Sequence, residues 1–71
     1  MKLRRNYKLG TLVTFKWYDD WRDEWQHPDN FRIIEGVVES NDFLESTCVY
    51  NGHENKYYSV PNSNIIKVFY V

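Results

Sequence analysis

The 71-residue chain contains a single cysteine, Cys48, so it cannot form an internal disulfide. A lone cysteine favours a reducing compartment, and its position in the run Ser-Thr-Cys-Val-Tyr predicts a small buried side chain. No stretch approaches the roughly 20 apolar residues of a membrane helix. The basic N-terminus is not followed by the apolar segment of about 7–15 residues that a signal peptide needs. These absences predict a soluble, cytoplasmic protein.

Metal-binding and catalytic motifs are lacking as well. His27, Cys48 and His53 are the only histidine and cysteine residues, and their spacing is not that of a zinc site. The acids of residues 19–30 lack the glycine and the final acid of a helix–loop–helix calcium site. No glycine-rich phosphate loop and no nucleophile–base pattern stands out. We therefore expect a non-catalytic protein with no cofactor and no metal.

The chain has little net charge, −1, but its charges are unevenly placed. Residues 1–18 hold five basic side chains and no acid, whereas the remainder holds four basic and ten acidic side chains. A chain of this size forms one domain and buries roughly 60% of the surface that its unfolded form exposes. Three Trp, six Tyr and four Phe exceed what such a core can absorb. About half of these aromatic side chains should lie at least partly at the surface.

Alternating apolar residues and turn signals predict five strands. Residues 13–17 alternate apolar and polar side chains, as expected for a strand with one buried face. Gly36, inside an apolar segment, indicates a bulge, a bend or a close backbone approach. The Asn51-Gly52 pair predicts a hairpin whose loop extends through residue 55, and residues 61–64 have turn chemistry. The predicted strands are residues 11–18, 31–40, 43–50, 56–60 and 65–70.

Residues 19–30 differ from the rest because they contain five acids and no β-branched residue. Three tryptophans recur at intervals of four residues, Trp17, Trp21 and Trp25. This spacing would align them on one face of a helix. Asp20 would cap a short helical turn with Asp23 at its third position, and Pro28 would end it. We expect a long acidic-aromatic loop with one or two helical turns.

The order of strands and the loop lengths resemble the SH3-like small β-barrel. In that comparison residues 19–30 are the long first loop, 40–42 the second connection, 51–55 the distal hairpin and 61–64 the single 3₁₀ turn. The run Val60-Pro61-Asn62-Ser63-Asn64-Ile65 looks like the closing segment of SH3 domains. The resemblance covers residues 10–70 and implies an all-β, five-stranded barrel. The domain would span residues 10–71, after a basic N-terminal segment of residues 1–9.

Shorter patterns, Gly10-Thr11-Leu12-Val13-Thr14-Phe15 and Gly36-Val37-Val38, are similar to those of KOW- and Tudor-like barrels. The tryptophan with which SH3 domains bind proline-rich peptides is missing, because residues 43–46 read Phe-Leu-Glu-Ser. The tyrosine that follows the turn proline in SH3 domains is missing too. Recognition of proline-rich ligands in the usual way is therefore not expected. The compact format also resembles small phage or prophage proteins of unknown function, which implies a modulator of a host protein.

The acidic-aromatic loop contains more than a barrel needs. Trp and Tyr side chains are enriched at protein interfaces and their hot spots, and surrounding acids favour a basic partner. We therefore predict a protein-binding site formed by Tyr18, Asp19, Asp20, Trp21, Asp23, Glu24 and Trp25. In the competing interpretation, Trp17 and one of the other two tryptophans pack under the loop and close one end of a barrel.

Nucleic-acid binding is the alternative function. A barrel face can stack bases on aromatic rings while basic groups contact phosphate. The candidates are Lys2, Arg4, Arg5, Lys8 and Lys16, together with Tyr57 or Tyr58. The acidic remainder of the chain argues against this function. A third interpretation is an oligomer that pairs edge strands through Phe69, Tyr70 and Val71, and we expect a monomer or a weak homodimer.

Overall fold

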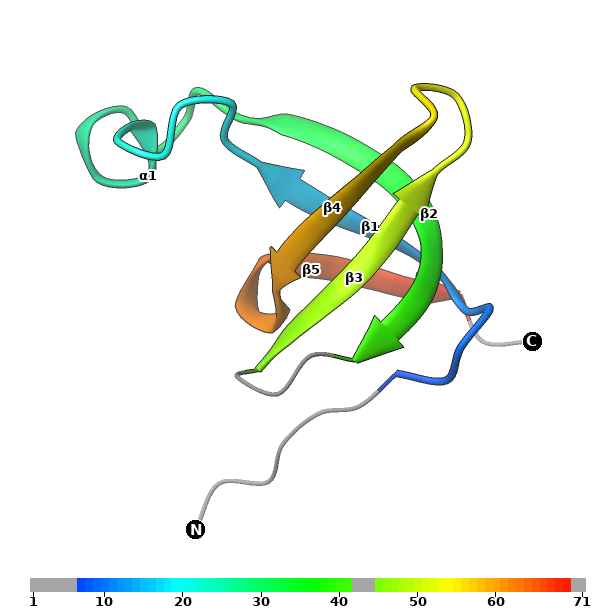
Figure 1. The fold of residues 1–71 in the computed structure, drawn as a ribbon. Helices are drawn as coiled ribbons and strands as arrows, with labels where there is room; N and C mark the ends of the chain where they lie inside the picture. The colour runs from blue at the N-terminus through cyan, green and yellow to red at the C-terminus, as the bar shows by residue number, and fades with distance from the viewer. Residues whose placement is uncertain (1–6, 42–44, 70–71) are drawn as a thin grey trace, which may run out of the picture.

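The computed structural model describes residues 7–41 and 45–69, which form one curled antiparallel sheet (Figure 1). The strands are β1 (Leu12–Trp17), β2 (Arg32–Asn41), β3 (Ser46–Asn51), β4 (Lys56–Pro61) and β5 (Ile65–Phe69). They lie in the order β4-β3-β2-β1-β5. The predicted all-β, five-stranded fold is confirmed. Within the described residues no pairing joins β4 to β5, so the expected closure into a barrel is not observed and these strands are the two edges.

The predicted strand ends differ from the observed ones by a few residues. Strand β4 includes Pro61, which faces Ser46 of β3. A proline is tolerated there because β4 is an edge strand and has no neighbour on its other side to receive an N–H. Residues 43 and 44 of the third predicted strand, and residue 70 of the last, lie outside the described part of the chain.

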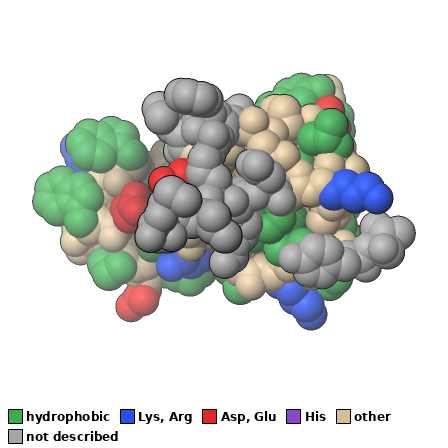
Figure 2. All heavy atoms as spheres, turned by 90° about the horizontal axis from the view of Figure 1, so that it is seen from below, with side chains coloured by type: hydrophobic (Ala, Val, Ile, Leu, Met, Phe, Trp, Pro, Cys, Tyr) green, Lys and Arg blue, Asp and Glu red, His purple; other side chains and the backbone are tan. Residues whose placement is uncertain are grey.

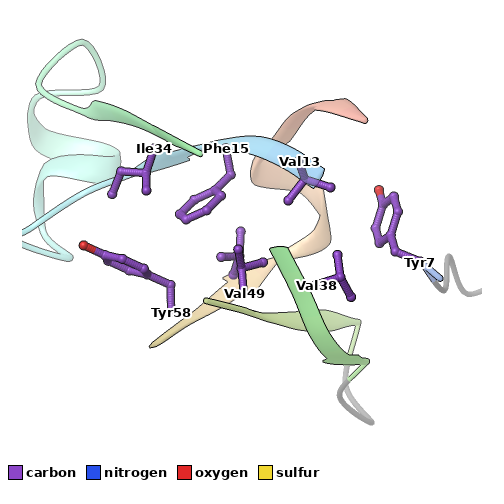
Figure 3. Packing of buried hydrophobic residues seen from close by; sticks show 8 residues of the cluster. Tyr7, Val13, Phe15, Ile34, Val38, Val49 and Tyr58 are labelled. Carbon is purple, nitrogen blue, oxygen red and sulfur yellow. The ribbon is translucent and has the colours of Figure 1, made fainter. Parts of the chain in front are cut away.

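The core lies on the concave face of the sheet, and the strand register explains its composition. Val13 lies opposite Gly36 and Phe15 lies opposite Ile34 in the β1–β2 ladder, so the same face of both strands is buried. Figure 3 shows these side chains pointing toward Val49 and Tyr58 from β3 and β4. The buried apolar residues are Tyr7, Val13, Phe15, Ile34, Val38, Val49, Tyr58 and Val60.

Tyr7 belongs to this core, although the sequence interpretation placed it in a separate basic segment. Its side chain is only 5% exposed. The side-chain amide of Asn41, the last residue of β2, binds both backbone groups of Tyr7. Asn41 Oδ1 accepts the Tyr7 N–H at 2.8 Å, and Asn41 Nδ2 donates to the Tyr7 carbonyl at 2.6 Å. This paired contact anchors the start of the described chain to the sheet.

The distal hairpin and the 3₁₀ turn agree with the predictions, but the connection predicted for residues 40–42 does not. Ser40 and Asn41 belong to β2, because they pair with Cys48 and Thr47 of β3, and residue 42 lies outside the described chain. The loop between β3 and β4 spans residues 52–55, and the Asn51 side chain stabilises it by accepting the Glu54 N–H at 2.8 Å and donating to the Glu35 carbonyl at 2.8 Å. The expected 3₁₀ turn is η1 (Asn62–Asn64), between β4 and β5. None of the described helices has the length and apolar character needed to cross a membrane.

Cys48 is only partly buried, so the prediction of a buried thiol is wrong. Its neighbours Thr47 and Val49 are fully buried. Successive residues of a strand point to opposite faces, which places Cys48 on the outer face of the sheet.

Candidate functional site

The acidic-aromatic loop, predicted for residues 19–30, lies in the segment of residues 18–31 that connects β1 to β2. It carries the short helix α1 (Asp23–Gln26). Figure 1 shows it projecting from one end of the sheet, away from both chain termini. The helix ends before His27-Pro28, as predicted. Its N-cap is Arg22 rather than Asp20. The Asp20 carboxylate accepts the Arg22 N–H at 3.0 Å, which places Asp20 in a turn just before the helix.

The three tryptophans do not share a helical face, because only four residues are helical. Trp17 ends β1, where it pairs with Arg32, and its ring packs edge-on against Tyr58 with 4.8 Å between ring centroids. Trp21 is 72% exposed and Trp25 is 66% exposed. The competing interpretation is therefore correct for Trp17, which packs against the core. Its expectation that Trp21 or Trp25 also packs under the loop is wrong, because both are exposed. Figure 2 shows hydrophobic side chains gathered, with acids beside them, at the end of the molecule that carries α1.

A polar network centred on Arg32 joins the base of this loop to the sheet. The Arg32 guanidinium binds both Asp19 carboxylate oxygens, at 2.8 and 2.9 Å, and one Glu54 oxygen at 2.9 Å. The Tyr58 hydroxyl donates to the other Glu54 oxygen and accepts a bond of 3.3 Å from Arg32. The ring of Tyr58 is 1% exposed, and its hydroxyl points out of the core toward this network (Figure 3). Arg32 thus links the buried core to Asp19, one of the residues of the predicted site.

These contacts shift the protonation equilibria of the network. The Tyr58 hydroxyl, and then the Arg32 guanidinium, lower the pKa of Glu54. The hydrogen bonds that Arg32 donates to Asp19, and then to Glu54, raise the pKa of Arg32. Burial, and then the Glu54 carboxylate, raise the pKa of Tyr58. The folded state therefore favours an ionised Glu54 and a neutral Tyr58.

Acidification should weaken this network. The folded-state pKa of Glu54 lies below its unfolded value, so its contribution to stability is complete above the unfolded pKa and is lost as the pH falls through the folded pKa. We expect the melting temperature of wild type to fall between pH 6 and pH 3 more than that of Glu54→Gln, which has no charge to lose. Thermal unfolding followed by circular dichroism over this pH range measures the difference. Equal pH dependence of the two proteins would contradict the role of Glu54.

Polar contacts inside the loop fix its shape. Arg22 and Asp20 form a two-bonded ion pair, at 3.1 and 2.9 Å, which lowers the pKa of Asp20. Asn30 Nδ2 donates to the Asp23 carboxylate at 2.7 Å, and the Tyr18 hydroxyl donates to the Pro28 carbonyl at 2.7 Å. Glu24 and Asp29, by contrast, make no ion pair with any described residue.

A cleft of about 200 Å³ separates the acidic-aromatic loop from the β4–η1 segment. Its lining residues are Trp17 at the end of β1, Tyr18, Trp21 and Glu24 of the loop, and Ser59, Pro61 and Asn64 of the β4–η1 segment. Three of the predicted site residues therefore meet here: Tyr18, Trp21 and Glu24. The other four, Asp19, Asp20, Asp23 and Trp25, do not line the cleft. Pro61 and Asn64 were predicted only as turn residues, because no local pattern indicates contact across some 40 residues of chain.

The basic residues of the alternative, nucleic-acid-binding site are not brought together at one place on the described surface. Lys2, Arg4 and Arg5 lie outside the described residues. Lys8 precedes β1 and Lys16 lies near its end, so the strand separates them. Tyr57 is 62% exposed, but Tyr58 is buried in the core and offers no ring face for stacking.

The outer face of the sheet carries a second apolar feature. The ladder places one residue from each strand in a row across the whole sheet: Phe69, Leu12, Val37, Tyr50 and Tyr57. A hollow of about 510 Å³ lies along part of this row, between β2 and the β3–β4 loop. It contains His53 and Glu54, but the described residues hold no group of three His, Cys, Asp or Glu that could bind a metal.

Comparisons with protein-family models, with curated proteins and with solved structures found no match to this chain, so its site is interpreted from its own residues and geometry.

Proposed function

We propose that this chain is a small, non-catalytic protein-binding module whose contact surface is the acidic-aromatic loop. The observation that carries the proposal is the exposure of Trp21 and Trp25, at 72% and 66%. Neither ring is needed for the core, which Phe15, Trp17 and Tyr58 fill at this end of the sheet. Large exposed aromatic side chains on a shaped loop are the usual anchors of protein interfaces.

The charge of the loop defines the kind of partner. Residues 19–30 contain five acids and one arginine. Asp19 and Asp20 are engaged by Arg32 and Arg22, whereas Glu24 and Asp29 make no ion pair within the described chain. The unpaired acids favour a partner with a basic surface, mainly because they increase the rate at which the two proteins associate. A modulator of a host protein with a basic site, the role implied by the resemblance to small phage proteins, would meet this requirement.

We further propose that the curled sheet is an SH3-like barrel in which β4 and β5 approach without a backbone ladder. The strand order β4-β3-β2-β1-β5, the long first loop and η1 before the last strand support this assignment. A cytoplasmic location is part of the proposal, because the single cysteine makes no disulfide. Nucleic-acid binding has weaker support, since the described basic residues are dispersed.

Capture of partners from source-cell lysate tests the proposal. We expect the wild-type domain to retain a protein that the Trp21→Ala/Trp25→Ala variant does not retain, with or without nuclease. Both rings are exposed, so the variant should fold with a free energy of unfolding within about 1 kcal/mol of wild type. Circular dichroism of both proteins checks this condition. Capture that survives the double substitution but disappears with nuclease would overturn the proposal in favour of nucleic-acid binding.

A further inference from the structure

We propose that the cleft between the acidic-aromatic loop and the β4–η1 segment receives an arginine side chain of the partner protein. The inference rests on the proposed function, and it assigns the chemical group that the loop recognises. It follows from three properties of the residues that line the cleft: several are aromatic, two can accept hydrogen bonds, and none is a cation.

The walls suit a flat, weakly hydrated cation. Three aromatic residues, Trp17, Tyr18 and Trp21, are among the residues that line the cleft, together with Pro61. A guanidinium stacks on aromatic faces, where the ring quadrupole attracts its charge. Lysine is less suited because its ammonium is compact and strongly hydrated. A neutral apolar side chain would gain from the aromatic residues but would offer no donor to the Glu24 carboxylate.

The two candidate acceptors come from different segments of the chain. Glu24 comes from α1 and makes no ion pair with a described residue. Asn64 comes from η1, and its Nδ2 donates to the Lys16 carbonyl at 3.3 Å. This bond orients the amide and leaves Oδ1 to accept from a ligand. A guanidinium carries five N–H donors in one plane and can bind acceptors on two sides at once.

The cleft lacks a cation, although the chain places cations near rings elsewhere. Ammonium groups lie 4.9–5.3 Å from ring centroids in three pairs: Lys16 with Phe31, Lys56 with Tyr58, and Lys67 with Phe69. None of the seven residues that line the cleft is basic. The lining residues themselves thus supply no positive charge to the aromatic residues and the carboxylate.

Titration of the ¹⁵N-labelled domain with N-acetylarginine amide tests the inference. We expect the indole N–H resonances of Trp17 and Trp21 to shift in a saturable way, with a dissociation constant in the millimolar range. The matched neutral ligand is N-acetylcitrulline amide, in which a urea replaces the guanidinium; it should produce no saturable shift. The indole resonance of Trp25, an exposed ring outside the cleft, should not move with either ligand.

Two pairs of variants separate the cleft from the rest of the loop. Trp21→Ala should weaken arginine binding about tenfold or more, and Trp25→Ala should not change it. Glu24→Gln should weaken binding about 3- to 10-fold, whereas Asp29→Asn, a neutralisation in the same loop outside the cleft, should have no comparable effect. Equal binding of the arginine and citrulline ligands, or shifts that do not depend on Trp21 and Glu24, would overturn the inference.

Failure of this inference and failure of the proposed function give different results. If the Trp21→Ala/Trp25→Ala variant loses a partner but the cleft does not bind arginine, the protein-binding function is retained and the arginine site is rejected. Arginine binding in the cleft, without any partner that depends on the loop, would reject the protein-binding function and retain the site.

Discussion

Replacing Gly36 by alanine should destabilise the fold by about 3 kcal/mol, the upper end for overpacking a well-packed site. A Cβ at this position would lie 2.5 Å from Val49 Cγ1 and 2.6 Å from the Tyr50 carbonyl oxygen. The valine could rotate, but the backbone oxygen belongs to β3 and can move only with that strand. Alanine in the middle of a strand is ordinarily favoured over glycine by roughly 0.5–1 kcal/mol. The clash should outweigh this gain.

Urea unfolding followed by circular dichroism measures the effect, and Gly52→Ala is the matched control. The nearest atom to a Cβ at Gly52 is Tyr50 Cε2 at 3.8 Å, an ordinary contact, and its φ is not in the left-handed region. The control should stay within about 0.5 kcal/mol of wild type. Similar stabilities of the two variants would mean that β2 and β3 do not approach as closely at Gly36 as the structure shows.

Truncation of Phe15 should have a still larger effect. Phe15 is fully buried, and its ring packs edge-on against Trp17 and Tyr58, with centroids 6.4 and 5.5 Å apart. Phe-to-Ala substitutions in cores cost about 3–5 kcal/mol, because the lost burial is combined with a cavity. A domain of this size is stabilised by only about 4–10 kcal/mol. Phe15→Ala should therefore lower the urea midpoint severely or leave the chain largely unfolded at room temperature.

Two further variants keep this prediction testable if Phe15→Ala does not fold. Phe15→Leu retains most of the apolar volume and should remain folded, with a loss of about 1–2 kcal/mol. Tyr57→Ala removes an aromatic ring that is 62% exposed and should cost less than about 1 kcal/mol. A Phe15→Leu variant as stable as wild type, or a larger loss for Tyr57→Ala, would contradict the assignment of Phe15 to the centre of the core.

The Phe15 cluster also connects stability to the candidate site. Tyr58 packs against Phe15 inside the core, and its hydroxyl joins the network of Arg32, Glu54 and Asp19 at the base of the loop. Trp17 lies against the same ring and lines the cleft. Trp21 and Trp25 have no such part in the core. Substitutions at the exposed rings can therefore separate binding from folding, whereas substitutions at Trp17 or Tyr58 cannot.

The sequence by itself determined the local elements of this protein. Alternation along residues 13–17 predicted β1, because a strand turns successive side chains to opposite faces. Pro28 ended the helix and residues 61–64 formed the 3₁₀ turn, since the backbone preferences of proline and asparagine act within a few residues. Gly36 indicated a bulge, a bend or a close backbone approach; the structure shows a close approach, to atoms of β3. Each of these features depends on short-range chemistry.

Only the tertiary structure decided which side chains are buried and which residues distant in the sequence contact one another. The spacing of the tryptophans suggested one helical face, but the β1–β2 ladder held Trp17 in a strand and left Trp21 in solvent. Tyr7 entered the core because Asn41, 34 residues later, binds its backbone. The cleft is lined by Glu24 and Asn64 together because the curl of the sheet brings the first loop to the last turn. Such contacts depend on how the whole sheet is curved, and no local pattern encodes that.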